Sequence, residues 1–180
     1  MRRVVFSILV DNVAGVLSRI SGLFSRRGYN IDSLTVGVTA DPRYSRITVV
    51  ARGDEIILDQ IEKQLNKLVD VIDIKCLDQE RSICKELVLV KIKANEEKRQ
   101  AVFAVANVFQ AKVTDVSKEA VMVELTGSQG KINGFIELLL QDGYEILELA
   151  RTGLTGLSRG TFDVKMYDEE GNLIDYDFQK

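Results

Sequence analysis

Asn12 and Gly15 are the residues whose types and spacing best suit the binding of a small molecule. They lie between Val4 to Val10, an apolar run of strand length, and apolar residues that recur at helical spacing from Val16 onward. Gly15 has no Cβ, so a ligand can approach its backbone, and the first N–H groups of a helix have no acceptor inside it. Free N–H donors at a helix start attract anions. The turn therefore predicts a site for a carboxylate.

Two asparagine amides extend this prediction. Asn12 offers both donors and an acceptor, which suits a zwitterion that carries one carboxylate and one ammonium. Asn30 follows Gly28, which we expect to end the helix, and it offers a second amide. A purely structural interpretation is also open, because Asn is favoured as a helix cap and in turns. From the turn alone, ligand binding and a structural role are equally acceptable.

Composition excludes several functional classes. The 180 residues are 46% hydrophobic, enough for one ordinary domain or two small ones. No apolar run approaches the roughly 20 residues that span a bilayer, and the apolar run after Arg2 and Arg3 meets Asp11 instead of a cleavage site. We expect a soluble, cytoplasmic protein without membrane contact. With no histidine and only Cys76 and Cys84, the chain lacks the usual nucleophile systems and zinc ligands. No other set of residues stands out as catalytic.

Charge is spread unevenly along the chain. Residues 161–180 hold six carboxylates against two lysines, while the rest is nearly neutral. Arg19, Arg26 and Arg27 share one predicted helix and are interpreted as a solvated face, so we expect no nucleic-acid binding. The tail carboxylates suggest either a metal site or a solvated acidic hairpin around Glu170 to Asn172, and we favour the hairpin.

The first part of the chain predicts the order strand, helix, strand, strand, helix, strand. The expected elements are a strand at Arg3–Val10, a helix at Gly15–Arg27, a hairpin of Ile31–Thr39 and Arg46–Arg52 around Asp41-Pro42-Arg43, a helix capped by Asp54, and a strand at Val69–Leu77. Residues 78–86 are polar and charged, and they are predicted to be a linker.

The same order of elements then repeats. Its expected parts are a strand at Leu87–Lys93, a helix capped by Asn95, a hairpin of Lys112–Val116 and Val121–Thr126, a helix opened by Ser128, and a strand at Ile146–Ala150. We therefore predict an α+β protein with two consecutive βαββαβ ferredoxin-like domains, at residues 1–77 and 87–152, each with two helices on one face of an antiparallel sheet. Residues 153–180 are expected to form a polar arm and an acidic tail.

Two further segments suggest contacts with other chains. Ser18, Ser21, Gly22 and Ser25 lie close together on the first helix, where small side chains would let a second copy of that helix approach as at a dimer seam. A solvated, serine-rich face explains the same pattern equally well. Arg151 to Gly160, reading RTGLTGLSRG, is too polar for a core strand, and we expect it to form a loop or arm that contacts a partner.

Several motifs together resemble a known family. The turn Asn12-x-x-Gly15 is followed by LFSRRGYNI, SLTVG, DPRYSR, QIEKQLNKLVDV and ARTGLTGLSRG, and this combination, between Arg2 and Gly160, resembles the regulatory small subunit of acetolactate synthase. The resemblance implies that residues 1–77 form an ACT domain, an amino-acid-sensing βαββαβ module. The second unit resembles the family in pattern until its final loop.

The resemblance also implies a function and its site residues. It implies a non-catalytic subunit that activates a separate catalytic large subunit and confers feedback inhibition by valine or another branched-chain amino acid. Thiamine diphosphate, magnesium and FAD are expected in that partner, with no cofactor in this chain. The effector would bind between two ACT domains of a homodimer, with Asn12, Gly15 and Val16 from one chain and Asn30 and Ile31 from the other. Ser18, Gly22 and Ser25 would form the dimer interface, and Arg151, Gly156, Ser158 and Arg159 would contact the catalytic subunit.

Two rival classes fit the sequence less well. A stand-alone metabolite sensor or transcription co-regulator built on ACT-like modules would be expected to carry a helix-turn-helix or a basic surface, and the sequence indicates neither. A small enzyme of the acylphosphatase kind needs an Arg/Asn phosphate cradle in its first loop, which here has Asn12 and no arginine.

Overall fold

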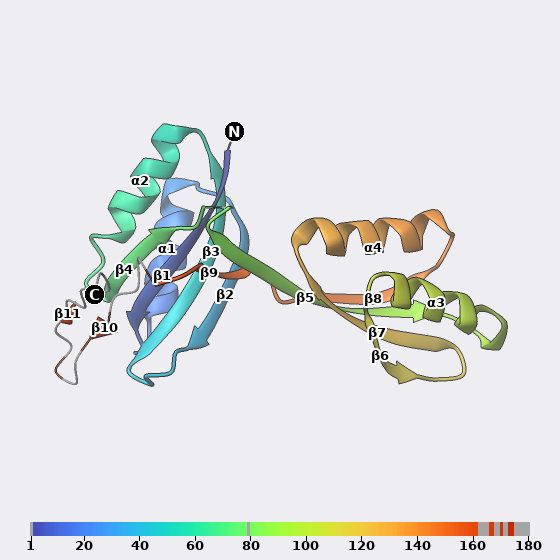
Figure 1. The fold of residues 1–180 in the computed structure, drawn as a ribbon. Coiled ribbons are helices and arrows are strands. Elements are labelled where there is room, and N and C mark those ends of the chain that lie inside the picture. Colours follow the sequence, from blue (N-terminus) through green and yellow to red (C-terminus); the bar gives the residue numbers. More distant parts are fainter. Residues whose placement is uncertain (1, 79, 162–165, 168–169, 171–172, 175–180) are drawn as a thin grey trace.

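Two βαββαβ units joined by one long strand make up the molecule, as the computed structural model shows for residues 2–78, 80–161, 166–167, 170 and 173–174 (Figure 1). Each unit has an antiparallel sheet and its own hydrophobic core. The predicted fold class is therefore confirmed. The fold arises because strand-length apolar runs alternate with amphipathic helices along the sequence, and this alternation occurs twice.

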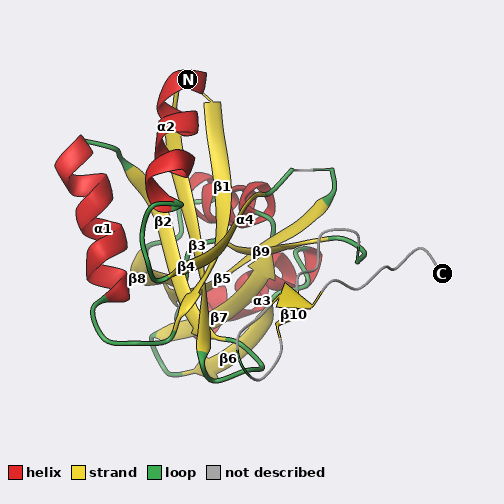
Figure 2. Ribbon diagram, turned by 90° about the vertical axis from the view of Figure 1, so that its left-hand side faces the viewer, coloured by secondary structure: helices red, strands yellow, loops and turns green. Residues whose placement is uncertain are grey.

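The first unit has a four-stranded sheet in the order β2-β3-β1-β4. Its elements are β1 (Arg2–Asp11), α1 (Val16–Arg27), β2 (Ile31–Val38), β3 (Tyr44–Gly53), α2 (Glu55–Leu65) and β4 (Val71–Cys76). Alternate residues of β1, such as Phe6 and Ile8, are buried against α1 and α2, which lie on the same side of the sheet (Figure 2).

The second unit repeats this plan with its sheet in the order β6-β7-β5-β8. Its elements are β5 (Ser82–Lys93), α3 (Glu96–Val108), β6 (Lys112–Val116), β7 (Ala120–Gly127), α4 (Gln129–Gln141) and β8 (Ile146–Arg151). Phe109 and Phe135 meet edge to face in its core, with ring centroids 5.2 Å apart. Figure 1 shows α3 and α4 on the same side of this sheet.

Three helices start at the expected side-chain caps. Asp54 accepts the backbone N–H of Ile57, Asn95 that of Lys98, and Ser128 that of Lys131. Each bond satisfies one of the donors that a helix leaves free at its start. The caps were predictable because the bond joins residues three positions apart, so it depends on local sequence alone.

The connection between the units differs from the expected linker. β5 begins at Ser82, and its first four residues pair with β9 (Thr155–Ser158), which returns to the first unit after the second is complete (Figure 1). Among the described residues, the short segments before Ser82 and between Arg151 and Thr155 connect the units without regular structure. Part of the expected linker and part of the expected arm thus form one two-stranded ribbon.

The tail forms a short antiparallel pair of β10 (Met166–Tyr167) and β11 (Leu173–Ile174), with Glu170 between them in a turn. This agrees with the predicted hairpin, but most of its carboxylates, including Asp163, Asp168 and Glu169, lie outside the described residues. In the part of the chain that is described, no helix is both long and apolar enough to cross a membrane.

Gly156 is where the ribbon tolerates no side chain. A Cβ there would lie 2.5 Å from Cys84 Sγ and 2.9 Å from Leu77 Cδ1. We expect Gly156→Val to destabilise the protein by about 1–3 kcal/mol, the usual cost of overpacking, as measured by urea unfolding. Gly130→Ala is the matched control, because a Cβ at Gly130 in α4 meets nothing within 4 Å. Equal stability of the two variants would contradict the packing of β9 on Leu77.

Candidate functional site

The turn between β1 and α1 has the geometry of an uncapped helix start. Gly15 is the N-terminal cap residue of α1, with φ of 89°, and no side chain caps the helix. A positive φ is favourable only for glycine, which explains the residue type at this position. The capping interpretation of Asn12 is therefore wrong. The first N–H groups of α1 are left without a side-chain acceptor, as an anion site requires.

Asn12 instead ties this turn to the hairpin between β2 and β3. Its Nδ2 donates to the Pro42 carbonyl at 2.9 Å, its Oδ1 accepts from Ser45 Oγ at 3.0 Å, and its backbone N–H donates to the Arg43 carbonyl at 2.7 Å. The second N–H of the amide has no acceptor among the described residues, so it is available to a ligand. Asn12 is thus held in one orientation beside the helix start.

Arg19 adds a positive charge that the sequence pattern did not single out. Its guanidinium reaches back to Gly15, where a Cβ would lie 3.0 Å from Nη1. Nε and Nη2 donate to the two carboxylate oxygens of Asp70 at 2.6 and 2.8 Å, which leaves Nη1 facing Gly15. An arginine in the first turn opposes the helix dipole, and this first turn has no acidic residue. A positive charge at a helix start is unfavourable, and this unfavourable placement was the sequence signal for a functional role of Arg19.

The other predicted effector residues lie at the opposite end of α1. Gly28 ends the helix with φ of 68°, and Asn30 and Ile31 follow it into β2. The 12 residues of α1 separate them from Gly15 by about 18 Å at 1.5 Å per residue. One chain therefore does not bring the two halves of the predicted site together.

The small residues of α1 lie at the surface between these two ends. Ser18 and Ser25 are exposed, Gly22 is half-buried, and a Cβ at Gly22 would meet nothing within 4 Å. Leu17 is also exposed beside them. This stripe of α1 can accommodate a close neighbour along its length, as the predicted dimer interface requires.

The residues predicted to contact the catalytic subunit have different environments. Arg151 forms a two-pronged ion pair with buried Glu86, through Nε at 2.8 Å and Nη2 at 2.7 Å, and this hydrogen bonding raises the pKa of Arg151. Gly156 is buried, so it offers no side-chain contact. Arg159 is exposed and Ser158 half-buried. Arg151 is exposed as well, but its guanidinium is already engaged by Glu86, so Ser158 and Arg159 are the accessible residues without such a pair.

The sequence analysis did not identify the apolar part of this ribbon. Ile83 and Leu157 are opposite each other across β5 and β9, and they are 47% and 59% exposed. Lys85 on β5 and Arg159, directly after β9, are also exposed. An apolar pair with cations beside it has the character of a protein-binding surface.

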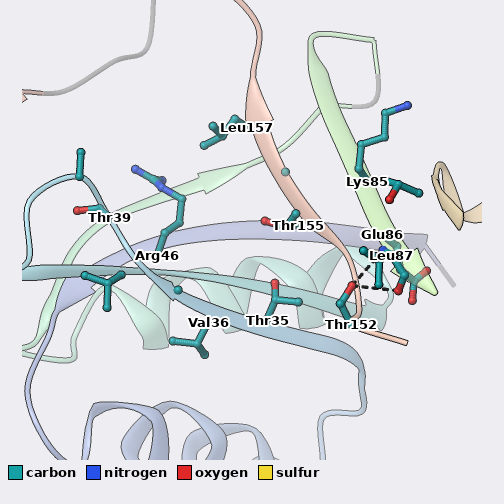
Figure 3. A pocket seen from close by; sticks show the side chains of 15 residues that line it. Thr35, Val36, Thr39, Arg46, Lys85, Glu86, Leu87, Thr152, Thr155 and Leu157 are labelled. Atoms are coloured by element: carbon teal, nitrogen blue, oxygen red, sulfur yellow. Dashed lines mark hydrogen bonds between the residues drawn. The ribbon is translucent and has the colours of Figure 1, made fainter. Parts of the chain in front are cut away.

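A groove of about 650 Å³ lies between the two units, lined by residues of β2, β5 and β9 (Figure 3). Arg46 rises from β3 between Thr39 and Leu157, and its Nη1 donates to Ser7 Oγ at 3.0 Å. None of the five predicted effector residues lines this groove. It is separate from the turn at Gly15.

The two thiols of the chain are in environments that disfavour the thiolate. Burial raises the pKa of both thiols, Cys76 and Cys84, which lowers the thiolate fraction at neutral pH. Among the described residues, no group of three carboxylates or thiols could hold a metal ion.

Comparison with known protein families matches both units. Residues 6–73 match the AHAS small subunit-like ACT domain, and residues 85–160 match the family described as the small subunit of acetolactate synthase. These two matches correspond to the two units of the fold.

Similar proteins come from archaea and bacteria. The probable acetolactate synthase small subunit of Methanothermobacter thermautotrophicus is 46% identical over 158 residues, which cover 87% of this chain and 93% of the relative. The acetolactate synthase isozyme 3 small subunit of Escherichia coli is 46% identical over 160 residues, covering 89% and 97%. The crystal structure of the acetolactate synthase small subunit from Thermotoga maritima superposes with a TM-score of 0.82 at 38% identity, covering 89% of this chain and 99% of that one.

The contacts of Asn12 make a testable contribution to stability. Asn12→Ala removes the bond to the Pro42 carbonyl and leaves the hydroxyl of buried Ser45 without its acceptor. We expect a loss of about 1–2 kcal/mol in the free energy of unfolding, measured by urea denaturation. Asn66→Ala, which removes one local bond at the end of α2, is the control with a smaller expected loss. An unchanged stability of Asn12→Ala would show that the amide does not hold the hairpin.

Proposed function

The chain belongs to the acetolactate synthase small-subunit family, and on that premise we propose that it binds valine or another branched-chain amino acid and transmits feedback inhibition to a catalytic large subunit. As a small subunit it has a regulatory role, with an ACT domain at residues 6–73. The donors at the start of α1 carry the proposal for the ligand.

Three kinds of donor lie on or beside the turn that ends at Gly15. They are the free N–H groups of the first turn of α1, the second amide N–H of Asn12, and Nη1 of Arg19. All three can donate to a carboxylate, although the Asp70 carboxylate already pairs with the other two nitrogens of Arg19 and offsets much of its charge. Val16, the first residue of α1, would bring its backbone to the same ligand. An α-amino acid has the carboxylate that this arrangement is suited to bind.

The second half of the site would come from a second chain. Asn30 and Ile31 lie about 18 Å from Gly15 along α1, too far to contact the same amino acid. An antiparallel pairing of α1 with its copy along Ser18, Gly22 and Ser25 would place the end of one helix beside the start of the other. We therefore assign the effector site to the interface of a homodimer, with two equivalent sites.

The catalytic chemistry would belong to the partner. Thiamine diphosphate, magnesium and FAD would be bound by the catalytic large subunit, whose activity this chain would raise. We place the contact with that subunit on the ribbon of β5 and β9, where Ile83 and Leu157 form an apolar pair and Ser158 and Arg159 are accessible. Arg151 would support the ribbon through its ion pair with Glu86.

The effector site is tested by adding a charge at Gly15. Gly15→Asp places a carboxylate among donors that would bind the effector carboxylate, so we expect activation of the catalytic subunit to persist while valine inhibition weakens at least about tenfold. Inhibition is measured on the reconstituted complex with increasing valine. Gly15→Asn is the control, because it brings the same strain at positive φ without the charge. Valine sensitivity of Gly15→Asp equal to that of the natural chain would refute the site assignment.

The partner surface is tested separately. Leu157→Asp puts a charge at the centre of the apolar pair, and we expect it to lower activation of the catalytic subunit about tenfold or more while valine binding by the isolated chain is kept. The control is Leu140→Asp, at an exposed position of α4 in the other unit. Normal activation by Leu157→Asp, titrated to saturation, would exclude the ribbon as the contact.

A further inference from the structure

The backbone of Leu154, just after the second unit, is hydrogen-bonded to the sheet of the first. Its N–H donates to Ser33 Oγ at 2.7 Å, and its carbonyl accepts from Thr35 Oγ1 at 2.9 Å. Ser33 and Thr35 are two positions apart on β2, so their side chains lie on the same face of the sheet. Leu154 itself is only 5% exposed. We call this pair of hydrogen bonds the Leu154 clamp.

The residues before Leu154 are fixed to the second unit. Thr152 exchanges hydrogen bonds with Leu87: its backbone N–H donates to the Leu87 carbonyl at 3.0 Å, and its Oγ1 accepts the Leu87 N–H at 3.1 Å (Figure 3). One residue earlier, Arg151 is held by Glu86 of β5. A displacement of Leu154 is therefore passed directly to β5 of the second unit.

Gly153 sets how closely the clamp approaches β2. Its φ is 86°, and a Cβ there would lie 2.6 Å from Ser33 Oγ and 3.3 Å from Thr35 Cγ2. Only glycine combines this backbone conformation with such a short distance. The clamp thus leaves little room for β2 and the arm to move independently.

The start of β2, directly before the clamp residues, is bonded to the predicted effector residue Asn30. Its Nδ2 donates to Asp32 Oδ1 at 3.1 Å, and Asp32 also accepts from Arg52 Nε at 2.5 Å. The pairing of β2 with β3 shifts register between Ile31 and Ser33, so Asp32 occupies an irregularity in the strand. A bulge of this kind directs the side chains that follow it, and the next one is Ser33.

We propose that the Leu154 clamp transmits effector occupancy from the first unit to the second. This rests on the proposed function, since it requires an effector at Asn30. An effector that binds the Asn30 amide draws it away from Asp32, which changes the irregularity at Asp32 and the direction of the Ser33 and Thr35 side chains. The Leu154 clamp then displaces residues 152–154, and with them β5, because Thr152 is bonded to Leu87. Inhibition follows if the effector binds the shifted arrangement more tightly than the resting one.

The experiment separates binding from transmission. The double variant Ser33→Ala, Thr35→Val removes both hydroxyls of the clamp with little change in shape. Thr126→Val is the matched control, because Thr126 lines the same groove but forms no hydrogen bond with Leu154. Valine affinity is measured by titration of the isolated chain, and valine inhibition is measured on the complex with the catalytic subunit.

We expect the double variant to bind valine within about twofold of the natural chain, but to need about tenfold more valine for inhibition or to lose inhibition altogether. The Thr126→Val control should match the natural chain in both assays. Natural inhibition by the double variant overturns the clamp. A natural chain that binds no branched-chain amino acid, alone or in the complex, overturns the proposed function and the clamp with it.

Hydrogen exchange in the natural chain supplies a test that does not depend on the variant folding. The Leu154 amide donates to Ser33 Oγ, so its exchange rate reports the clamp directly. We expect saturating valine to change this rate by about threefold or more. An unchanged rate, measured with valine bound, overturns the proposal.

Discussion

The length of α1 is the constraint on which the regulatory interpretation depends. Its 12 residues hold Gly15 and Asn30 about 18 Å apart, so no single chain can close both ends around one small molecule. The same helix carries a stripe of small, accessible residues along which a second copy can approach. In the proposed dimer, the packing of α1 against its copy would therefore also complete two binding sites. A monomer offers a helix start with donors and, at the far end, an amide already bonded to Asp32.

Because the chain returns to its first unit, the two units are physically coupled, as transmission from a ligand site requires. Two ferredoxin-like units joined only by a flexible linker would move independently, and a ligand on one would have little effect on the other. Here β5 extends from one unit into the other, β9 pairs with its first part, and Leu154 is bonded to β2. The ribbon that joins the units also exposes Ile83 and Leu157 beside the groove of Figure 3. The proposed ligand site and the proposed partner surface are thus connected through β2, Leu154 and the ribbon.

What the sequence predicted well was local. Periodicity gave the strands and helices, and the caps at Asp54, Asn95 and Ser128 followed because their bonds span three residues. Contacts between residues that are distant in the sequence were not predicted. Ser82 to Lys85 belong to a segment polar enough to suggest a linker, and their strand depends on partners 70 to 76 residues away. Arg19 could be interpreted as a surface charge because its partner Asp70 is 51 positions distant. Gly156 was expected at a contact surface, yet its lack of a side chain serves packing on Cys84.

The most direct test mixes two defective chains. Gly15→Asp damages the start of α1 and Asn30→Ala damages its far end, so neither variant alone should bind valine. If each site takes one end from each chain, a dimer of one variant with the other has one intact site and one doubly damaged site. After subunit exchange at equal amounts, titration should recover roughly a quarter of the original sites, with natural affinity, because half of the dimers are mixed. No recovery in dimers shown to be mixed would contradict the shared site and place the whole effector site within one chain.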